Sequence, residues 1–335
     1  MSTVQTVLGA IDSSELGTTL MHEHIRISWD GWDKDSTVTF NREEELARAA
    51  DRLAELKSLG ISTFVDAAPI DLGRNVEFLA EVSQRSGVNI ICAVGLYHTE
   101  HGFPGYFRLR DVDELAEIYA KELNDGVGNT GIRPGLIKCA TPSHEIGEHE
   151  EKALRAAARA HLATGAPIYT HTTEGKLGPQ QVEIFLSEGV DPRAFSIGHC
   201  CWNSDLRYHL GILKNGCHIG IDQIGLTYLM PDEVRLAIVA TLCRMGYAGQ
   251  LFMSQDHVSC YPGRFIKLPP EIMEVLSKRT YTYLLKTFIP RLRDEWGVPD
   301  DTITQIMRDN PRRFFEEARA VAKAGQTHGA ASGGN

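Results

Sequence analysis

Two histidines separated by a single residue, His22 and His24, are the side chains in this sequence that point most directly to chemistry. They lie in the apolar segment 19–25, which is typical of a β-strand. Alternate residues of a strand face the same side, so the two imidazoles can offer two neutral nitrogen ligands to one metal ion. Because such triplets also arise by chance, the pair alone leaves open a solvated or packed pair of histidines.

Other residues of the same chemical kind stand where apolar, β-rich runs give way to loops. They are Lys138 after 136–137, His171 after 167–170, His199 after 195–198 and Asp256 after 251–255. Histidine, aspartate and a suitably placed lysine are residues that bind metals or move protons. Five strands that place such residues at the same end predict one active site at which the side chains converge.

The elements that must position these residues alternate between strand and helix. Strands are predicted at 20–25, 62–66, 90–96, 135–139, 168–171, 196–199, 218–221 and 251–254. Helices are predicted at 42–59, 76–85, 112–124, 148–164, 180–188, 205–214 and 231–245. Eight strands separated by helices predict an α/β fold, the TIM (β/α)8 barrel, whose active sites lie at the carboxyl ends of the strands. The sequence has no Gly-x-Gly-x-x-Gly turn after a strand, which argues against a dinucleotide-binding fold.

The length and composition agree with a barrel enzyme. The chain has 335 residues, of which 42% are hydrophobic, enough for one large core. We expect a single domain over residues 1–324 and a flexible tail at 325–335, where Gly, Ala and Ser dominate.

The charge and the apolar pattern exclude several classes of partner. A formal net charge of -10 argues against binding to nucleic acid, which needs clustered Lys and Arg. The N-terminus has no signal-peptide pattern, and the chain has no apolar run long enough to span a bilayer, so we expect a cytoplasmic protein without a membrane partner. The seven irregularly spaced cysteines suit reduced thiols in the core. Cys200 and Cys201 follow His199 and are expected to pack, although an approach to a metal stays open.

The constellation of His22, His24, Lys138, His171, His199 and Asp256 resembles the ligand set of the phosphotriesterase family in the amidohydrolase superfamily. Thr-His-Thr around His171, Gly-His at 198–199 and the segments 7–9, 16–17 and 309–315 extend the resemblance over nearly the whole chain. The resemblance implies two divalent metal ions, one held by His22, His24 and Asp256 and the other by His171 and His199. It also implies that Lys138 reacts with carbon dioxide and bridges the two ions as a carbamate (N6-carboxylysine). Family members are often dimers, so a homodimer is expected from the resemblance.

The residue types fit that chemistry. An ammonium group cannot bind a metal, whereas a neutral, desolvated lysine can add carbon dioxide and offer one oxygen to each ion. Mixed nitrogen and carboxylate ligation suits zinc, which we expect first, and also cobalt, manganese or iron. Two such ions would share a hydroxide that acts as the nucleophile near neutral pH. Asp256 would take the proton from it and pass the proton on.

Two features favour an ester carbonyl as the group that the hydroxide attacks. Tyr97 corresponds to a tyrosine that lactonase-like members of the family place against the two metals, although it could also pack the rim. The segment 257–278 is long and rich in apolar residues, so it could enclose an acyl tail. The predicted substrate-binding residues are Tyr97, Gln223, His257, Tyr261 and Phe265.

Some polar residues near the predicted mouth depart from this pattern or leave alternatives open. Gln223 stands where many lactonases of the family have Arg, so the pocket loses a positive charge. His98 and His101 are expected either to contact a polar group of the substrate or to be solvated on the rim. Asp66 is expected either to orient a ligand histidine or to cap the turn that follows it.

The sequence therefore predicts a binuclear metal-dependent hydrolase that opens the ring of an N-acyl-homoserine lactone or another γ- or δ-lactone. The small-molecule substrate could instead be an organophosphate triester, and another carboxylester or an amide is a third option. A non-catalytic binding protein stabilised by metals is the alternative from a different class, and an open ligand position argues against it.

Overall fold

The computed structural model describes residues 2–264 and 267–332, with residues from 326 onward described by their backbone alone. The strands are β1 Thr3–Thr6, β2 Gly9–Asp12, β3 Thr18–Arg26, β4 Ile61–Asp66, β5 Asn89–Gly95, β6 Leu136–Thr141, β7 Ile168–Thr172, β8 Phe195–Ile197, β9 His218–Ile221, β10 Leu251–Met253 and β11 Val258–Cys260. The α-helices are α1 Arg42–Ser58, α2 Val76–Ser86, α3 Gly105–Arg108, α4 Val112–Asp125, α5 Glu148–Thr164, α6 Gly178–Ser187, α7 Leu206–Leu213, α8 Asp232–Arg244, α9 Pro270–Ser277, α10 Ile289–Asp294, α11 Asp300–Thr304 and α12 Asn310–Ser332.

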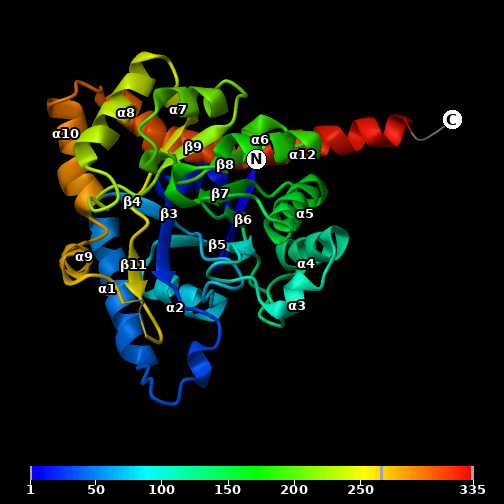
Figure 1. Ribbon diagram of the computed structural model, residues 1–335, viewed down its shortest axis with the longest axis horizontal. Helices are drawn as coiled ribbons and strands as arrows, with labels where there is room; N and C mark the ends of the chain where they lie inside the picture. The colour runs from blue at the N-terminus through cyan, green and yellow to red at the C-terminus, as the bar shows by residue number, and fades with distance from the viewer. Residues whose placement is uncertain (1, 265–266, 333–335) are drawn as a thin grey trace.

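Parallel strands form the centre of the molecule, and the helices surround them (Figure 1). Over the described residues, the sheet has nine strands in the order β10-β9-β8-β7-β6-β5-β4-β3-β11. Strands that follow one another in the chain are neighbours in the sheet, and helices connect most of them. Repeated β-α-β units of this kind are what the sequence pattern predicts for a TIM barrel.

The sheet closes on itself through residues 251–260, which form the eighth barrel strand in two pieces. β10 pairs with β9, and β11 pairs with β3. Between these pieces, the Asp256 amide donates to the His22 carbonyl at 3.2 Å, and the His24 amide donates to the His257 carbonyl at 3.0 Å. The first and last barrel strands are thus joined, and the fold is a TIM barrel with no open sheet edge between them.

Two buried clusters lie on opposite sides of the barrel wall. The inner cluster includes Met21, Val65, Ile91, Tyr169 and Phe252 from the strands. It is completed at the amino-terminal end of the strands by Val4 of β1 and by Phe314 and Phe315 of α12. The outer cluster packs the strands against the helices. Side chains therefore fill the amino-terminal end of the barrel interior, and active sites of this fold lie at the carboxyl ends of the strands.

Local signals in the sequence set the ends of several helices. The side chains of Asn41, Asn75 and Asp111 accept backbone hydrogen bonds at the starts of α1, α2 and α4. Such caps stabilise a helix by about 1 kcal/mol each. Gly87 and Gly165 end α2 and α5 in the left-handed conformation, which glycine adopts without a steric penalty.

The eight strands and seven helices predicted from the sequence are all present, with shifts of a few residues at their ends. The sequence analysis did not identify β1, β2, α3 or the helices from α9 onward. The segment 257–278 is not one long loop, since it contains β11 and α9. α12 continues through Gly325 to Ser332, and its last part projects from the barrel, so this part of the expected tail has a helical backbone (Figure 1). The domain boundary at residue 324 and the flexibility of the tail stay predictions.

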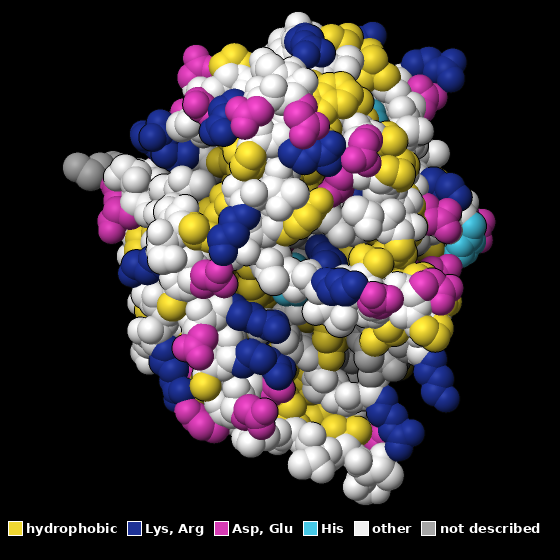
Figure 2. Space-filling model, turned by 90° about the vertical axis from the view of Figure 1, so that its left-hand side faces the viewer, with side chains coloured by type: hydrophobic (Ala, Val, Ile, Leu, Met, Phe, Trp, Pro, Cys, Tyr) yellow, Lys and Arg dark blue, Asp and Glu magenta, His cyan; other side chains and the backbone are white. Residues whose placement is uncertain are grey.

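One face of the surface and the cysteines can be described beside the fold. Lys and Arg side chains alternate with Asp and Glu over the face in Figure 2, which has no continuous basic patch. A helix long and apolar enough to cross a bilayer is not found among the described residues. All the cysteines are free, and Cys200 and Cys201 are buried in the outer core cluster, which confirms their packing role.

Candidate metal centre

The six predicted ligands meet at the carboxyl end of the barrel. His22 and His24 lie on β3, Lys138 on β6 and His171 on β7, while His199 and Asp256 directly follow β8 and β10. Together they form the floor of a cavity of about 310 Å³. His22, His24, Lys138 and His199 are buried. The convergence predicted from strand ends is therefore present in the structure.

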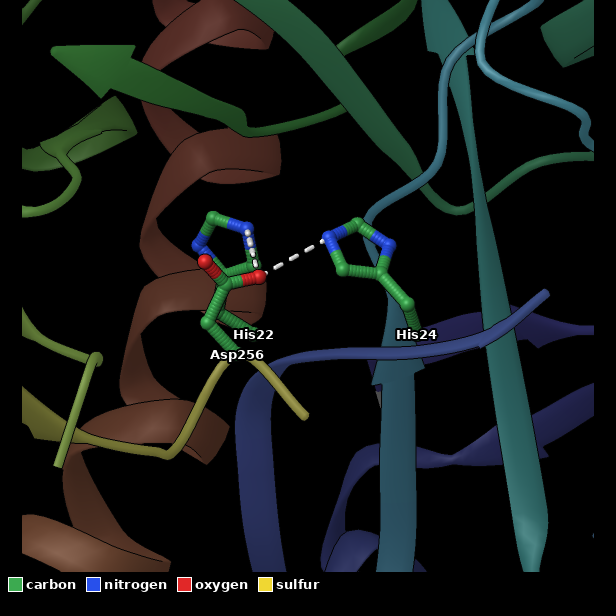
Figure 3. Close-up of side chains that lie close together, drawn as sticks. All are labelled: His22, His24 and Asp256. Carbon is green, nitrogen blue, oxygen red and sulfur yellow. Dashed lines mark ion pairs between the residues drawn. The ribbon is translucent and has the colours of Figure 1, made fainter. Parts of the chain in front are cut away.

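Asp256 is the centre of the group. Its Oδ1 lies 3.1 Å from His24 Nε2 and 3.9 Å from His22 Nε2. Dashed lines in Figure 3 mark these two contacts. Its Oδ2 lies 3.8 Å from His199 Nε2. These distances place three imidazole nitrogens around one carboxylate, and His22, His24 and Asp256 form a group of ligand atoms close enough to hold one ion.

Asp222, at the end of β9, orients two of these histidines, and the sequence analysis did not single it out. Its Oδ2 lies 3.0 Å from His22 Nδ1, and its Oδ1 lies 2.9 Å from His199 Nδ1. Tyr169 also donates its hydroxyl to Oδ2 at 2.7 Å. A carboxylate accepts from a protonated Nδ1, so the neutral form of either ring directs an unprotonated Nε2 at Asp256. Burial alone would raise the pKa of Asp222, but the two imidazoles hold that pKa well below its usual range.

Lys138 lies in a setting that favours its neutral form. Its Nζ is 3.2 Å from His22 Nε2 and 3.2 Å from the Thr170 carbonyl, and it has no carboxylate hydrogen-bond partner among the described residues. Burial lowers the pKa of Lys138 to about 8. A larger fraction of neutral amine is therefore present near neutral pH than for a solvated lysine, which is the form that reacts with carbon dioxide.

His171 lies next to His199, with ring centroids 4.4 Å apart, but on the outer side of the group. Its Nε2 is 3.0 Å from the Thr173 hydroxyl, which in turn donates to the Thr141 carbonyl. The Tyr97 hydroxyl is 3.3 Å from the imidazole nitrogens. Tyr97 thus reaches the predicted centre rather than only packing the rim.

The backbone at two of the ligands is strained. His199 has φ of 59° and Asp256 has φ of 50°, in the left-handed region that costs a non-glycine residue about 1–3 kcal/mol. Glu23 holds Asp256 in place, because its carboxylate accepts from the amides of Gln255 at 2.8 Å and His257 at 2.9 Å. Strain maintained by surrounding contacts is typical of functional sites.

Asp66 supports His24 and the following turn together. Its Oδ1 lies 3.9 Å from His24 Nδ1 and accepts from the Ala68 amide at 3.1 Å. Its Oδ2 accepts from the Ile25 amide at 2.7 Å. Burial would lower the pKa of His24, but the Asp256 and Asp66 carboxylates raise it to about 9. Asp66 therefore does both things expected from the sequence: it lies against a ligand histidine, and it caps the turn that follows it.

The predicted substrate-binding residues have different positions. Gln223 lines the cavity and donates from Nε2 to Asp256 Oδ2 at 3.1 Å. Tyr97 and Tyr261 also line the cavity. His257 does not line the cavity; its ring packs instead against Tyr281, with centroids 4.4 Å apart. Phe265 lies outside the described residues.

Further residues complete the cavity wall. Leu268 and Leu276 lie in the segment 257–278 that was expected to enclose an acyl tail, and the others were not predicted as part of the site. Most are apolar or aromatic and come from the loops that follow β3, β8, β9 and β11. They include Ile27, Trp29, Leu72, Trp202, Leu226, Tyr228, Leu229, Leu268, Leu276 and Arg279. Loop residues of this kind give no periodic signal in the sequence, so only the fold brings them together.

The family model described as the phosphotriesterase family matches residues 2–315. The chain belongs to the phosphotriesterase family. A phosphotriesterase homology protein of Mycobacterium tuberculosis is 36% identical over 326 residues, which cover 94% of this chain and 98% of the relative. An aryldialkylphosphatase of Saccharolobus solfataricus is 30% identical, with coverage of 91% and 97%. A mutant of a Deinococcus radiodurans phosphotriesterase-like lactonase has a TM-score of 0.89 and 37% identity, with coverage of 93% of this chain and 99% of that structure.

As a member of the phosphotriesterase family, the protein is a metal-dependent hydrolase that acts on ester bonds. The family uses a binuclear metal centre, and the residues present fit such a centre. Asp222 leaves the Nε2 atoms of His22 and His199 as acceptors, and both of them face the Asp256 carboxylate, which is itself an acceptor. This excess of buried acceptors is expected of side chains that ligate cations.

Proposed function

We propose that this hydrolase is a lactonase that opens a γ- or δ-lactone, such as an N-acyl-homoserine lactone. The observation that supports the proposal is the Tyr97 hydroxyl, which reaches His171 at 3.3 Å inside a cavity whose wall is mostly apolar. His22, His24 and Asp256 would hold one divalent ion, and His171 and His199 the other, with Lys138 between them as a carbamate. Zinc is the ion proposed first, and cobalt, manganese or iron would also suit these ligands.

Two bound ions would supply an activated water and polarise the substrate carbonyl. Asp256 is placed to accept the proton of the attacking water, since it lines the cavity and its two oxygens lie beside the Nε2 atoms of His24 and His199. It would then give that proton to the alkoxide that leaves as the ring opens. Gln223 donates to Asp256 Oδ2 and so fixes the carboxylate for this transfer.

The Tyr97 hydroxyl is proposed to orient the lactone ring. Burial raises the pKa of Tyr97, so the hydroxyl stays protonated and can donate a hydrogen bond to a substrate oxygen. The leucines of the cavity wall, such as Leu226, Leu229 and Leu268, can contact an acyl tail. The cavity thus offers a polar hydroxyl at its floor and leucines along its wall, which fits an ester with one polar head and one apolar tail.

Hydrolysis of an organophosphate triester is the second candidate. It is favoured by the name of the Saccharolobus relative, an aryldialkylphosphatase, and by Gln223, which leaves the pocket without the arginine of many lactonases. A neutral triester needs no countercharge at that position.

The homodimer, the small-molecule partner and the cytoplasmic location stay predictions.

The deciding experiment compares kcat/KM for lactones of graded tail length and for an aryl dialkyl phosphate triester, with metal and bicarbonate supplied. We expect about 10⁴ M⁻¹s⁻¹ or more on a lactone and far less on the triester. Tyr97→Phe should reduce the lactone value by about tenfold and leave the triester value nearly unchanged. Tyr106→Phe, at an exposed tyrosine, is the matched control. A triester preference, or an equal loss on both substrates, would contradict the lactonase proposal.

A further inference from the structure

The loop between β5 and α3 has a fixed shape set by two buried acids. The Asp71 carboxylate accepts from the Tyr97 amide at 2.8 Å and from the Phe103 amide at 2.6 Å, so one side chain joins both ends of the loop. In its middle, the Thr99 amide and hydroxyl donate to Glu150 Oε1 at 2.8 and 2.7 Å. The loop is therefore held at three points.

This loop brings two histidines and a glutamate together. The amides of His101 and Gly102 donate to the His98 carbonyl at 3.3 and 3.0 Å, which folds the backbone into a turn. The His98 and His101 rings lie with centroids 5.2 Å apart and almost perpendicular. His98 Nδ1 is 3.7 Å from Glu100 Oε2. One potential ligand atom from each of the three residues lies within 4.8 Å of the other two.

His98 gives the second, independent sign of a ligand. Its side chain is 1% exposed, and its Nδ1 makes no hydrogen bond to any described residue. A buried polar atom without a partner costs about 1–3 kcal/mol, and this one faces Glu100 Oε2. A cation between the two atoms would remove that cost.

The neighbours of the cluster leave those ligand atoms available. Trp29 stacks on the face of His101 with centroids 5.2 Å apart, which orients the ring. His144 Nδ1 lies 3.4 Å from Glu100 Oε1, so Oε2 is the oxygen that faces His98. Glu100 and His101 are exposed, which gives an ion access from solvent.

We propose that His98, Glu100 and His101 form a third metal site, separate from the binuclear centre, for a borderline divalent ion such as Zn²⁺. Two imidazoles and one carboxylate are a ligand set that such ions bind, and three protein ligands leave a position open. His98 and His101 also line the substrate cavity, so a bound ion narrows its entrance. The site is thus a place where excess metal inhibits the enzyme. This inference goes beyond the proposed function and does not depend on the substrate.

The test counts ions on the intact chain by equilibrium dialysis against Zn²⁺, followed by metal analysis. At a Zn²⁺ concentration that fills the site in the wild type, the wild type should take up one more ion per chain than His101→Ala or Glu100→Gln. The reason is that the third ion should bind at least about tenfold more weakly in both variants. Glu145→Gln removes one exposed negative charge from a nearby loop and should match the wild type. Equal ion counts in the wild type and both variants, at unchanged melting temperatures, would overturn the proposal.

A second measurement follows activity on whichever ester the enzyme hydrolyses, as Zn²⁺ is raised beyond saturation of the binuclear centre. The fractional loss of kcat/KM should be large in the wild type and in Glu145→Gln, and small in His101→Ala and Glu100→Gln. An equal loss in all four proteins would refute an inhibitory role. Failure on every lactone would contradict the lactonase proposal but leave the ion count as a separate result.

Discussion

The carboxylate of Glu23 fixes the backbone on both sides of Asp256. It accepts from the Gln255 amide at 2.8 Å and from the His257 amide at 2.9 Å, while Asp256 itself has the left-handed φ of 50°. Glu23 stands between His22 and His24 in the chain, so three consecutive residues supply two ligands and hold a third in position. The middle residue of the triplet is therefore part of the site.

Replacing Glu23 with Gln should weaken metal binding. The amide group has one acceptor oxygen in place of two, so one backbone amide beside Asp256 loses its partner. We expect the apparent metal affinity to fall by about 10- to 100-fold, as for other residues that orient ligands. Metal titration followed by activity measures this effect, with Glu117→Gln on α4 as the control. Unchanged affinity in Glu23→Gln would mean that the strained backbone at Asp256 is stable without it.

Asp222→Asn should have a similar effect for a different reason. An asparagine presents an NH2 group to one of the two Nδ1 atoms, so one histidine must adopt the wrong tautomer. The expected loss of metal affinity is again about 10- to 100-fold. Tyr169→Phe removes one of the four hydrogen bonds to Asp222, leaves both imidazole contacts in place and should cost much less. If the two variants bind metal equally well, the tautomer explanation is wrong.

The barrel and the ligand set could be predicted because both depend on short, repeated patterns. Each strand is an apolar run that ends in a polar residue, and in a parallel barrel all such ends meet at one face. That rule placed His22 on β3 and Asp256 after β10 at the same site, although they are far apart in the sequence.

The parts that could not be predicted depend on side-chain direction and on loops. Asp222 also ends an apolar strand, so the same rule could have found it, but aspartates at strand ends often cap turns. His257 was predicted to bind the substrate, yet its ring packs against Tyr281 and does not line the cavity. Most of the cavity residues from Leu226 to Arg279 come from loops, whose positions follow from tertiary contacts, and Leu276 lies on α9.

Gln223→Leu tests whether the glutamine sets the position of the proton acceptor. The change keeps the approximate size of the side chain and removes the donor to Asp256 Oδ2. A hydrogen bond to a charged group contributes about 1.5–3 kcal/mol, so kcat/KM should fall by roughly tenfold or more. Metal content should stay the same, since Gln223 is not a proposed ligand. A variant with full activity would show that Asp256 is positioned by its other contacts.

Lys138 can be tested for the carbamate without any activity assay. Protein reconstituted with metal and ¹³C-labelled bicarbonate should show one labelled carbonyl carbon by NMR, because burial keeps a larger share of this amine neutral. Lys138→Gln should lose the signal and bind fewer metal ions. Lys121→Gln, at a lysine paired on the surface with Asp125, should keep both. A ¹³C signal that persists in Lys138→Gln would mean that the carbamate forms on another amine.

His218 should make the barrel sensitive to acid. Its ring is buried and stacks on Phe252 with centroids 5.1 Å apart, while Phe314 contacts it edge-on. Burial lowers the pKa of His218 from 6.5 to about 3. Below pH 6.5 the unfolded chain binds a proton that the folded protein does not, so the folded state loses about 1.4 kcal/mol of relative stability for each pH unit down to about 3.

His218→Leu removes this proton uptake, so the variant should gain stability relative to the wild type as the pH falls. Between pH 6.5 and 4.5 the gain should be about 2–3 kcal/mol, whatever packing is lost at neutral pH. Thermal unfolding of both proteins gives the difference in the free energy of unfolding at each pH. Metal is removed from both proteins first, so that protonation of the metal-binding side chains contributes equally. The matched control is Ile219→Val, at a buried neighbour on β9 that has no titratable group, so its difference from the wild type should stay constant. A constant difference for His218→Leu as well would mean that the folded barrel admits the proton, either by hydration of the ring or by local opening at Phe252.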